Sequence, residues 1–133
     1  MKTLVAVVVA CLAVPAFAAD KIITVTFDSI LAMESKSGEK VDGKMFKFGP
    51  EVAGAEQDTS AASSSGFGKS KEESCKWALL SSFLKFQAQA KQKGKKVVGV
   101  RTYAGATEGA KADQLVCLAG AMVVRSTVKA GYK

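Results

Sequence analysis

The sequence predicts an α+β fold in which a small sheet of about four strands packs on one long helix and carries one disulfide. Three observations lead to this fold class. Short runs of β-branched and aromatic residues are bounded by glycine and other turn formers, which is typical of strands. Residues 71–93 repeat apolar side chains at helical spacing. Two cysteines follow a secretory-type N-terminus, in a setting where thiols oxidise.

Residues 1–18 have the pattern of a secretory signal peptide. Lys2 precedes an uncharged apolar run over residues 4–14, and the small residues at 16–18 indicate cleavage after Ala18. The apolar run is shorter than the roughly 20 residues that a membrane span needs, so no transmembrane segment is expected after cleavage. We therefore predict export to the periplasm.

An alternative processing site lies inside the same apolar run. Residues 8–11, which end at Cys11, resemble a lipoprotein box, and Cys11 would then carry a lipid. The apolar run continues past Cys11, however, and a box there would leave a very short hydrophobic region. We favour simple cleavage, which leaves residues 19–133 as one domain of ordinary size.

The front half of the exported chain predicts two strands and a loop. Residues 22–27 are rich in β-branched and aromatic side chains, as strands are. Asp42 and Gly43 form a turn signal before a short second strand over residues 44–48. Residues 51–68 contain mainly alanine, glycine, serine and acidic residues, so we expect a flexible loop that buries little.

Residues 71–93 carry the signals of a complete helix. Ser70 and Glu73 form a capping box, and Gly94 occupies the position of a helix C-terminal glycine. The apolar residues form two stripes at helical spacing, which usually means core packing. The first stripe is Cys75, Leu79, Phe83, Phe86 and Ala90, and the second is Trp77, Leu80, Leu84 and Ala88. The second stripe could also cover a partner or a second copy of the chain.

The remaining residues predict two further strands, which gives the order strand, strand, helix, strand, strand. Residues 97–103 form the third strand, and residues 104–113 form a loop of small residues. The apolar run over residues 115–124 is too short and too interrupted by glycine for a buried helix. We expect one central strand over residues 115–128, with a bulge at Gly120.

Cys75 and Cys117 are the two cysteines left after signal cleavage, and we predict that they form a structural disulfide. Counting by twos places Cys117 on the strand face that would meet the helix stripe starting at Cys75. A redox-active pair is the alternative, but such pairs usually occur as Cys-x-x-Cys, which is absent here. Closing a loop of about 42 residues would contribute roughly 4 kcal/mol through the unfolded state.

The positive charge is concentrated in the second half of the chain. The formal net charge is +7, and residues 69–133 hold thirteen basic against four acidic residues. Such a surface attracts anionic lipid headgroups, lipopolysaccharide phosphates or an acidic protein, although a lysine-rich surface also simply favours solubility. Nucleic acid is not expected, since no basic-aromatic pattern that stacks bases is present. The candidate partner surface consists of Trp77, Lys85, Lys91, Lys93, Lys95 and Lys96.

The composition predicts no catalytic, metal or cofactor site. The chain contains no histidine, so Ser-His-acid and Cys-His arrangements cannot form, and zinc would lack its usual ligands. Residues 38–45 match the spacing of a phosphate-binding loop up to Lys44. Met45 stands where serine or threonine should hold magnesium, and the required strand and helix are missing from the pattern. We therefore expect a protein that is not an enzyme.

Three stretches resemble a known group of proteins. They are Cys75 on the helix, the run from Ala90 through Gly94 to Val100, and the run Leu115–Ala121. These stretches are similar to small exported bacterial proteins labelled "excinuclease ATPase subunit". They are also similar to the YbjQ-like domain and, more distantly, to the outer-membrane stress-sensor lipoprotein of the Rcs system. The resemblance implies a few strands with one long helix, disulfide-bonded in the exported members.

The chain departs from these relatives in ways that bear on function. The stress sensor is lipidated and uses two disulfides, whereas the exported chain has cysteines for one, with Arg101 in the strand where another is expected. The YbjQ-like family carries a heavy-metal-binding label, and the chain shows no matching ligand set. We expect a non-enzymatic periplasmic binding or envelope-associated protein that acts through a surface. The alternative is a metal-binding or redox stress-response protein of the envelope.

Overall fold

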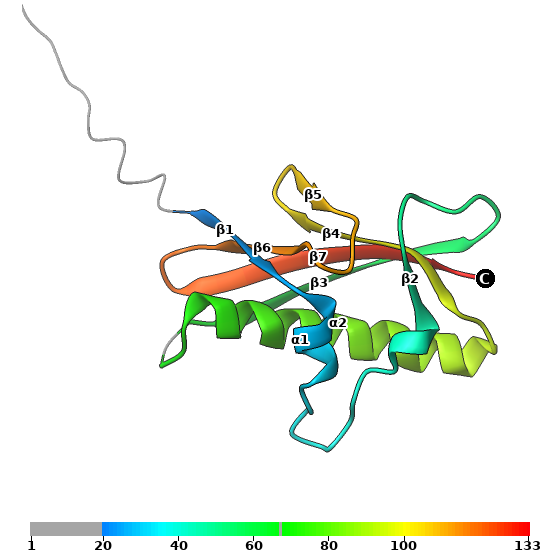
Figure 1. Ribbon diagram of the computed structural model, residues 1–133, viewed down its shortest axis with the longest axis horizontal. Helices are drawn as coiled ribbons and strands as arrows, with labels where there is room; N and C mark the ends of the chain where they lie inside the picture. Colours follow the sequence, from blue (N-terminus) through cyan, green and yellow to red (C-terminus); the bar gives the residue numbers. More distant parts are fainter. Residues whose placement is uncertain (1–19, 67) are drawn as a thin grey trace, which may run out of the picture.

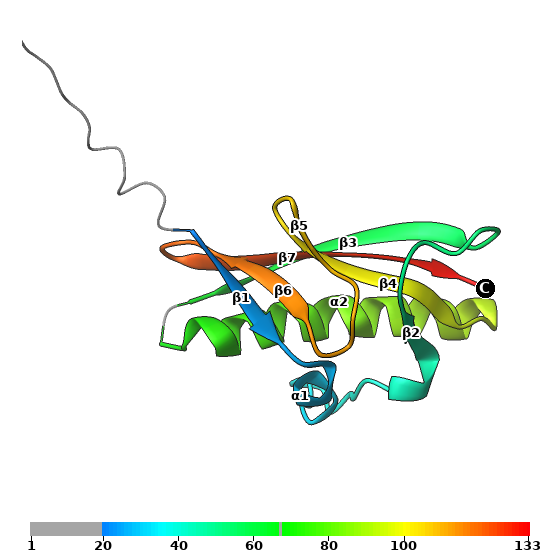
Figure 2. The ribbon, with the colours of Figure 1, turned by 45° about the horizontal axis from the view of Figure 1, so that its top comes forward.

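The computed structural model, which describes residues 20–66 and 68–133, places one long helix along one face of a curled sheet (Figures 1 and 2). The α+β class and the long helix are therefore confirmed, but the sheet has seven strands in place of about four. Residues 1–18, predicted as a signal peptide, lie outside the described residues. The elements are β1 (Lys21–Val25), α1 (Phe27–Leu31), the 3-10 turn η2 (Gly43–Met45), β2 (Phe46–Phe48), β3 (Glu56–Ser65), α2 (Lys71–Lys93), β4 (Val97–Ala104), β5 (Thr107–Gly109), β6 (Leu115–Ala119) and β7 (Val123–Tyr132).

Strand β7 is the centre of the sheet. One of its edges pairs along its whole length with β3, and the other edge is shared by β6 and β4. The sheet continues from β6 to β1 and from β4 to β2, with the short β5 attached to β4. All pairs are antiparallel except β2 with β4. Strands β4, β6 and β7 therefore have neighbours on both sides.

Strand β3 overturns the prediction of a flexible loop over residues 51–68. Residues 56–65 pair in continuous register with β7, from Glu56 opposite Tyr132 to Ser65 opposite Val123. Serine and alanine have little intrinsic preference for strands, so the long-range ladder with β7 decides the conformation. The small side chains also let α2 approach closely, and the buried hydroxyls of Ser60 and Ser82 lie 3.1 Å apart.

The prediction of one central strand over residues 115–128 is also wrong. These residues belong to two antiparallel strands, β6 and β7, which form a hairpin. The Gly120 N–H donates to the Val123 carbonyl at 2.9 Å, which closes the turn between the two strands. Gly120 is thus a turn residue and makes no bulge. The irregularity lies in β4 at Gly99, whose φ is +64° and where an added Cβ would meet the Pro50 oxygen at 2.9 Å. Glycine is the residue that adopts this conformation without strain.

Helix α2 begins and ends as its sequence predicts. The Ser70 hydroxyl accepts from the Glu73 N–H at 3.0 Å, and Gly94 is left-handed with φ +67°. The stripe that starts at Cys75 is buried against the sheet. Its Phe83 ring packs edge-on against Phe27 at 5.2 Å and against Phe46 at 5.3 Å. Helix α1, which the sequence did not predict, supplies Phe27 to this aromatic core.

Candidate functional site

The disulfide between Cys75 and Cys117 is present and joins the N-terminal part of α2 to β6. Their Cα atoms lie 5.7 Å apart, and both residues are fully buried. Thiol–disulfide exchange requires a thiolate that can reach the sulfur, so burial protects this bond. The geometry supports the structural interpretation of the pair.

The predicted partner surface divides into two separate regions. Trp77 and Lys85 line a groove on the outward side of α2, together with Leu84 and Ala88 of the second stripe. The four other lysines lie around the C-terminal end of α2. Leu80 of the second stripe is buried, whereas Trp77 and Leu84 are half-buried and only partly covered by the core. The second stripe is therefore partly core and partly accessible.

The groove over α2 has a volume of about 490 Å³ and two distinct walls. One wall is the segment 35–39, which contributes Lys36 and Glu39, and the other is β3, which contributes Ser63 and Ser64. Gln87 holds the first wall, since its amide oxygen accepts from the Asp42 N–H at 2.7 Å and its nitrogen donates to the Lys40 carbonyl at 3.0 Å. The groove thus has an apolar floor and polar rims.

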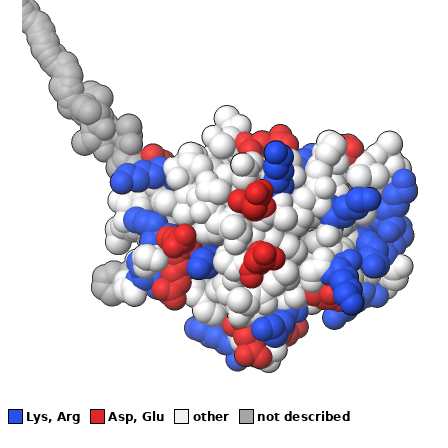
Figure 3. All heavy atoms as spheres, in the orientation of Figure 1, with Lys and Arg blue, Asp and Glu red and all other residues white. Residues whose placement is uncertain are grey.

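Lysines far apart in the sequence meet at the other end of α2. The exposed side chains of this basic end are Lys44, Lys47, Lys91, Lys93, Lys95, Lys96 and Lys133. Lys96 and Lys133 exchange backbone hydrogen bonds, and the Lys96 Nζ donates to the Lys44 carbonyl at 3.4 Å. Figure 3 shows blue spheres gathered at the end of the molecule where α2 and the chain end. Sequence reasoning found four of these lysines and missed Lys44, Lys47 and Lys133, since only the fold brings them near.

Few acidic groups oppose this charge. Lys93 forms an ion pair with Glu56 at 3.1 Å and lies 5.4 Å from the centre of the Tyr132 ring. The Tyr132 hydroxyl donates to the Asp58 carboxylate at 2.8 Å. Burial first, and then this hydrogen bond and the negative charge, raise the pKa of Tyr132 above its usual range. The Tyr132 hydroxyl is therefore protonated at neutral pH, and it serves as a structural hydrogen-bond donor to Asp58.

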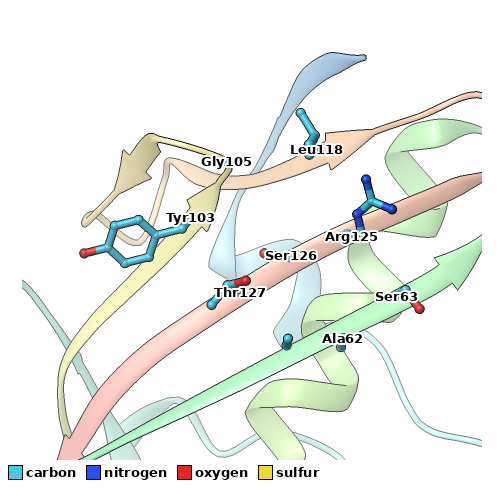
Figure 4. A pocket seen from close by; sticks show the side chains of 9 residues that line it. Ala62, Ser63, Tyr103, Gly105, Leu118, Arg125, Ser126 and Thr127 are labelled. Carbon is cyan, nitrogen blue, oxygen red and sulfur yellow. The ribbon is translucent and has the colours of Figure 1, made fainter. Parts of the chain in front are cut away.

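The face of the sheet away from α2 carries a shallow hollow of about 360 Å³, which the sequence did not predict (Figure 4). Tyr103 of β4 and Arg125 of β7 lie on opposite sides of it, with Thr127 between them. The Lys129 Nζ lies 5.1 Å from the centre of the Tyr103 ring. The Ser126 hydroxyl donates to the Val116 carbonyl at 2.8 Å and is already used within the sheet. The hollow therefore offers a mixed polar and apolar contact surface.

Residues 20–66 and 68–133 contain neither a cluster of metal ligands nor a helix that could span a membrane. No group of three or more histidine, cysteine or acidic side chains is placed there to hold a metal ion. In the same residues, no helix has the length and apolar character needed to cross a membrane.

Arg101 is buried in β4. Its Nε donates to the Gly99 carbonyl at 2.9 Å, and its guanidinium lies 3.8 Å from Glu51. Its role is to hold the irregular part of β4.

Comparison of the chain with protein-family models, curated protein sequences and solved structures finds no match. The resemblance to the YbjQ-like domain and to the Rcs stress sensor stays a prediction from the sequence.

Proposed function

We propose that the protein is exported to the periplasm and acts there without catalysis, by binding an anionic component of the envelope through its basic end. The observation that carries the proposal is the gathering of seven exposed lysines at one end of the molecule, with Glu51 and Glu56 as the nearby carboxylates. Each lysine close to an anionic lipid surface contributes about 1 kcal/mol, and the attraction falls off within a Debye length.

The arrangement of the lysines supports binding to an extended anionic surface. They come from η2, β2, the end of α2, the turn after it and the last residue, so they sit on a rigid scaffold. The disulfide secures the opposite end of α2, where Cys75 is the fifth residue of the helix. A rigid cluster loses less side-chain and loop entropy on binding than a flexible tail would.

The alternative, a metal-binding or redox stress protein, finds less support. In the part of the chain that the structure describes, the cysteine sulfurs are those of the fully buried Cys75 and Cys117. A redox sensor would need an accessible thiolate, and a metal site would need clustered ligands. We therefore place surface binding first.

The decisive experiment compares two triple charge reversals of the chain from residue 19. One variant carries Lys47→Glu, Lys91→Glu and Lys95→Glu in the basic end. The control carries Lys21→Glu, Lys76→Glu and Lys111→Glu, which change the net charge equally but lie away from that end. Binding is measured by flotation with vesicles of phosphatidylglycerol and of phosphatidylcholine.

We expect wild type and control to bind the anionic vesicles, less so as salt rises, and the basic-end variant to lose most of this binding. None of the three proteins should bind the phosphatidylcholine vesicles. Equal losses in the two variants would show that net charge alone acts, and would overturn the assignment to the basic end.

A further inference from the structure

Strand β3 leaves one edge of the sheet open. The Gly66 N–H donates to the Met122 carbonyl at 3.0 Å and continues the register between β3 and β7. In an antiparallel ladder, directly bonded pairs alternate with unbonded pairs. The even-numbered residues of β3 therefore bond to β7, and the odd-numbered ones turn their N–H and C=O groups towards the open edge.

Both ends of this edge are closed by the chain itself. The Thr59 N–H donates to the carboxylate of Asp58 at 2.8 Å. At the other end, the Ser65 carbonyl accepts from the Ser74 hydroxyl at 3.0 Å. Between them, the outward backbone groups of Ala61 and Ser63 have no partner within residues 20–66 and 68–133. The open part of the edge is thus a short window centred on residue 62.

The window lacks the features by which edge strands usually prevent association. Residues 59–65 contain no charged residue and no proline, and β3 carries no bulge. The apolar groove over α2 adjoins the same window, since Ser63 and Ser64 form its second wall. Trp77 and Leu84 lie half-buried in its floor. Unpaired backbone and accessible apolar surface therefore coincide, which indicates a docking site for an extended strand.

We propose that a second copy of the chain docks here, with the two β3 strands antiparallel across a two-fold axis through Ala62. Ala61 of each copy then exchanges backbone hydrogen bonds with Ser63 of the other, so the unpartnered groups satisfy one another. A two-fold interface must be self-complementary, and this register meets that condition. The seven-stranded sheet would continue into its copy. This association goes beyond the proposed envelope binding and stands without it.

Charge favours a second copy as the occupant. The acidic residues of β3, Glu56 and Asp58, lie at one end of the strand. In the proposed register Glu56 comes opposite Gly68 of the second copy, beside its Lys69, and the two acidic ends lie far from each other. Like charges opposite each other would destabilise a strand pair, and none meet here. The small side chains of Ala62 and Ser64 leave room for an identical strand.

Ala61→Pro tests the edge directly. The Ala61 N–H points away from β7, so proline removes no bond of the β3–β7 ladder, and edge strands tolerate it. We expect wild type to sediment at twice the mass of its chain and Ala61→Pro at the single mass. Ala61→Ser, which keeps the N–H, is the matched control and should remain a dimer. Near-ultraviolet circular dichroism establishes that each variant is folded.

A cysteine at the axis tests the register, and it decides the question if Ala61→Pro does not fold. Ala62 would oppose itself in an unbonded pair with a Cα separation of about 4.5 Å, within the range of a disulfide. Ala62→Cys should therefore cross-link into a covalent dimer under mild oxidation. Ser37→Cys, an exposed control in the segment 35–39, should not.

Two results would overturn the proposal. One is a wild-type protein that stays at the single mass at every concentration. That result overturns the proposal even if the protein binds some other extended peptide at β3. The other is a dimer that persists in Ala61→Pro while Ala62→Cys fails to cross-link, since the copies would then meet through another surface.

Discussion

Removing the disulfide tests whether Cys75 and Cys117 act as one structural staple. The bond joins residues separated by 42 positions, and the loop-closure relation gives about 4 kcal/mol of stabilisation through the unfolded chain. A domain of this size has a total stability of about 5–15 kcal/mol, so the bond is a large part of it. With an unfolding entropy of about 2.1 cal/mol/K per residue over about 115 residues, the melting temperature should fall by roughly 16 °C.

The assay is thermal and urea unfolding of Cys75→Ala, Cys117→Ala and the double variant. Cutting either end opens the same loop, so each single change should cost as much as both together. Alanine is chosen because a serine hydroxyl would be buried without a partner at these fully buried positions. Additive losses, or a shift of only a few degrees, would refute the reasoning, because the two cysteines would then stabilise the fold separately or very little.

Three further changes test other parts of the fold. Gly99→Ala should destabilise by more than about 1 kcal/mol, because φ is positive and a Cβ would press on backbone; Gly105→Ala, equally left-handed but in open space, should cost less in the same urea titration. Because the pKa of Tyr132 is raised in the folded protein, the unfolded chain loses the tyrosine proton at a lower pH than the folded chain does. The free energy of unfolding should therefore decline as the pH rises above about 10. Tyr132→Phe should show a shallower decline in unfolding experiments across that range. Gln87→Leu leaves two backbone groups, the Asp42 N–H and the Lys40 carbonyl, without their hydrogen-bond partner. The free energy of unfolding should therefore fall by about 1–3 kcal/mol, and amide exchange in the segment 40–42 should become faster.

The parts of the fold that could be predicted rest on local signals. The bounds of α2 follow from Ser70 and Gly94, which act within one turn of the helix. The pairing of Cys75 with Cys117 follows from two cysteines in an oxidising setting and from the side-chain period of a strand. Of the candidate partner surface, the lysines at the end of α2 could be found because they are consecutive in the sequence. The groove beside Trp77 could only be suspected, because its walls come from distant segments.

The parts that were missed depend on long-range pairing. The run from Leu115 to Val128 reads as one apolar strand, and only the tight turn at Gly120 divides it into β6 and β7. A turn inside an apolar run gives no polar signal of its own. Strand β3 was missed for the opposite reason, since its serines and alanines have the composition of a loop. Its conformation is imposed by β7, which lies about sixty positions further along the chain.

The composition that makes β3 resemble a loop also suits this strand to pairing with a second copy. Larger side chains on the inward face of β3 would keep α2 away, and the buried contact between Ser60 and Ser82 would be lost. Charged side chains would protect the edge from association, as they do in most edge strands. The sequence keeps small, uncharged residues from Thr59 to Ser65 on both faces, although only the face towards α2 needs them for packing. Packing accounts for Ser60, but it does not account for Ala61 and Ser63, whose side chains lie on the other face. Close approach of a second β3 strand accounts for both.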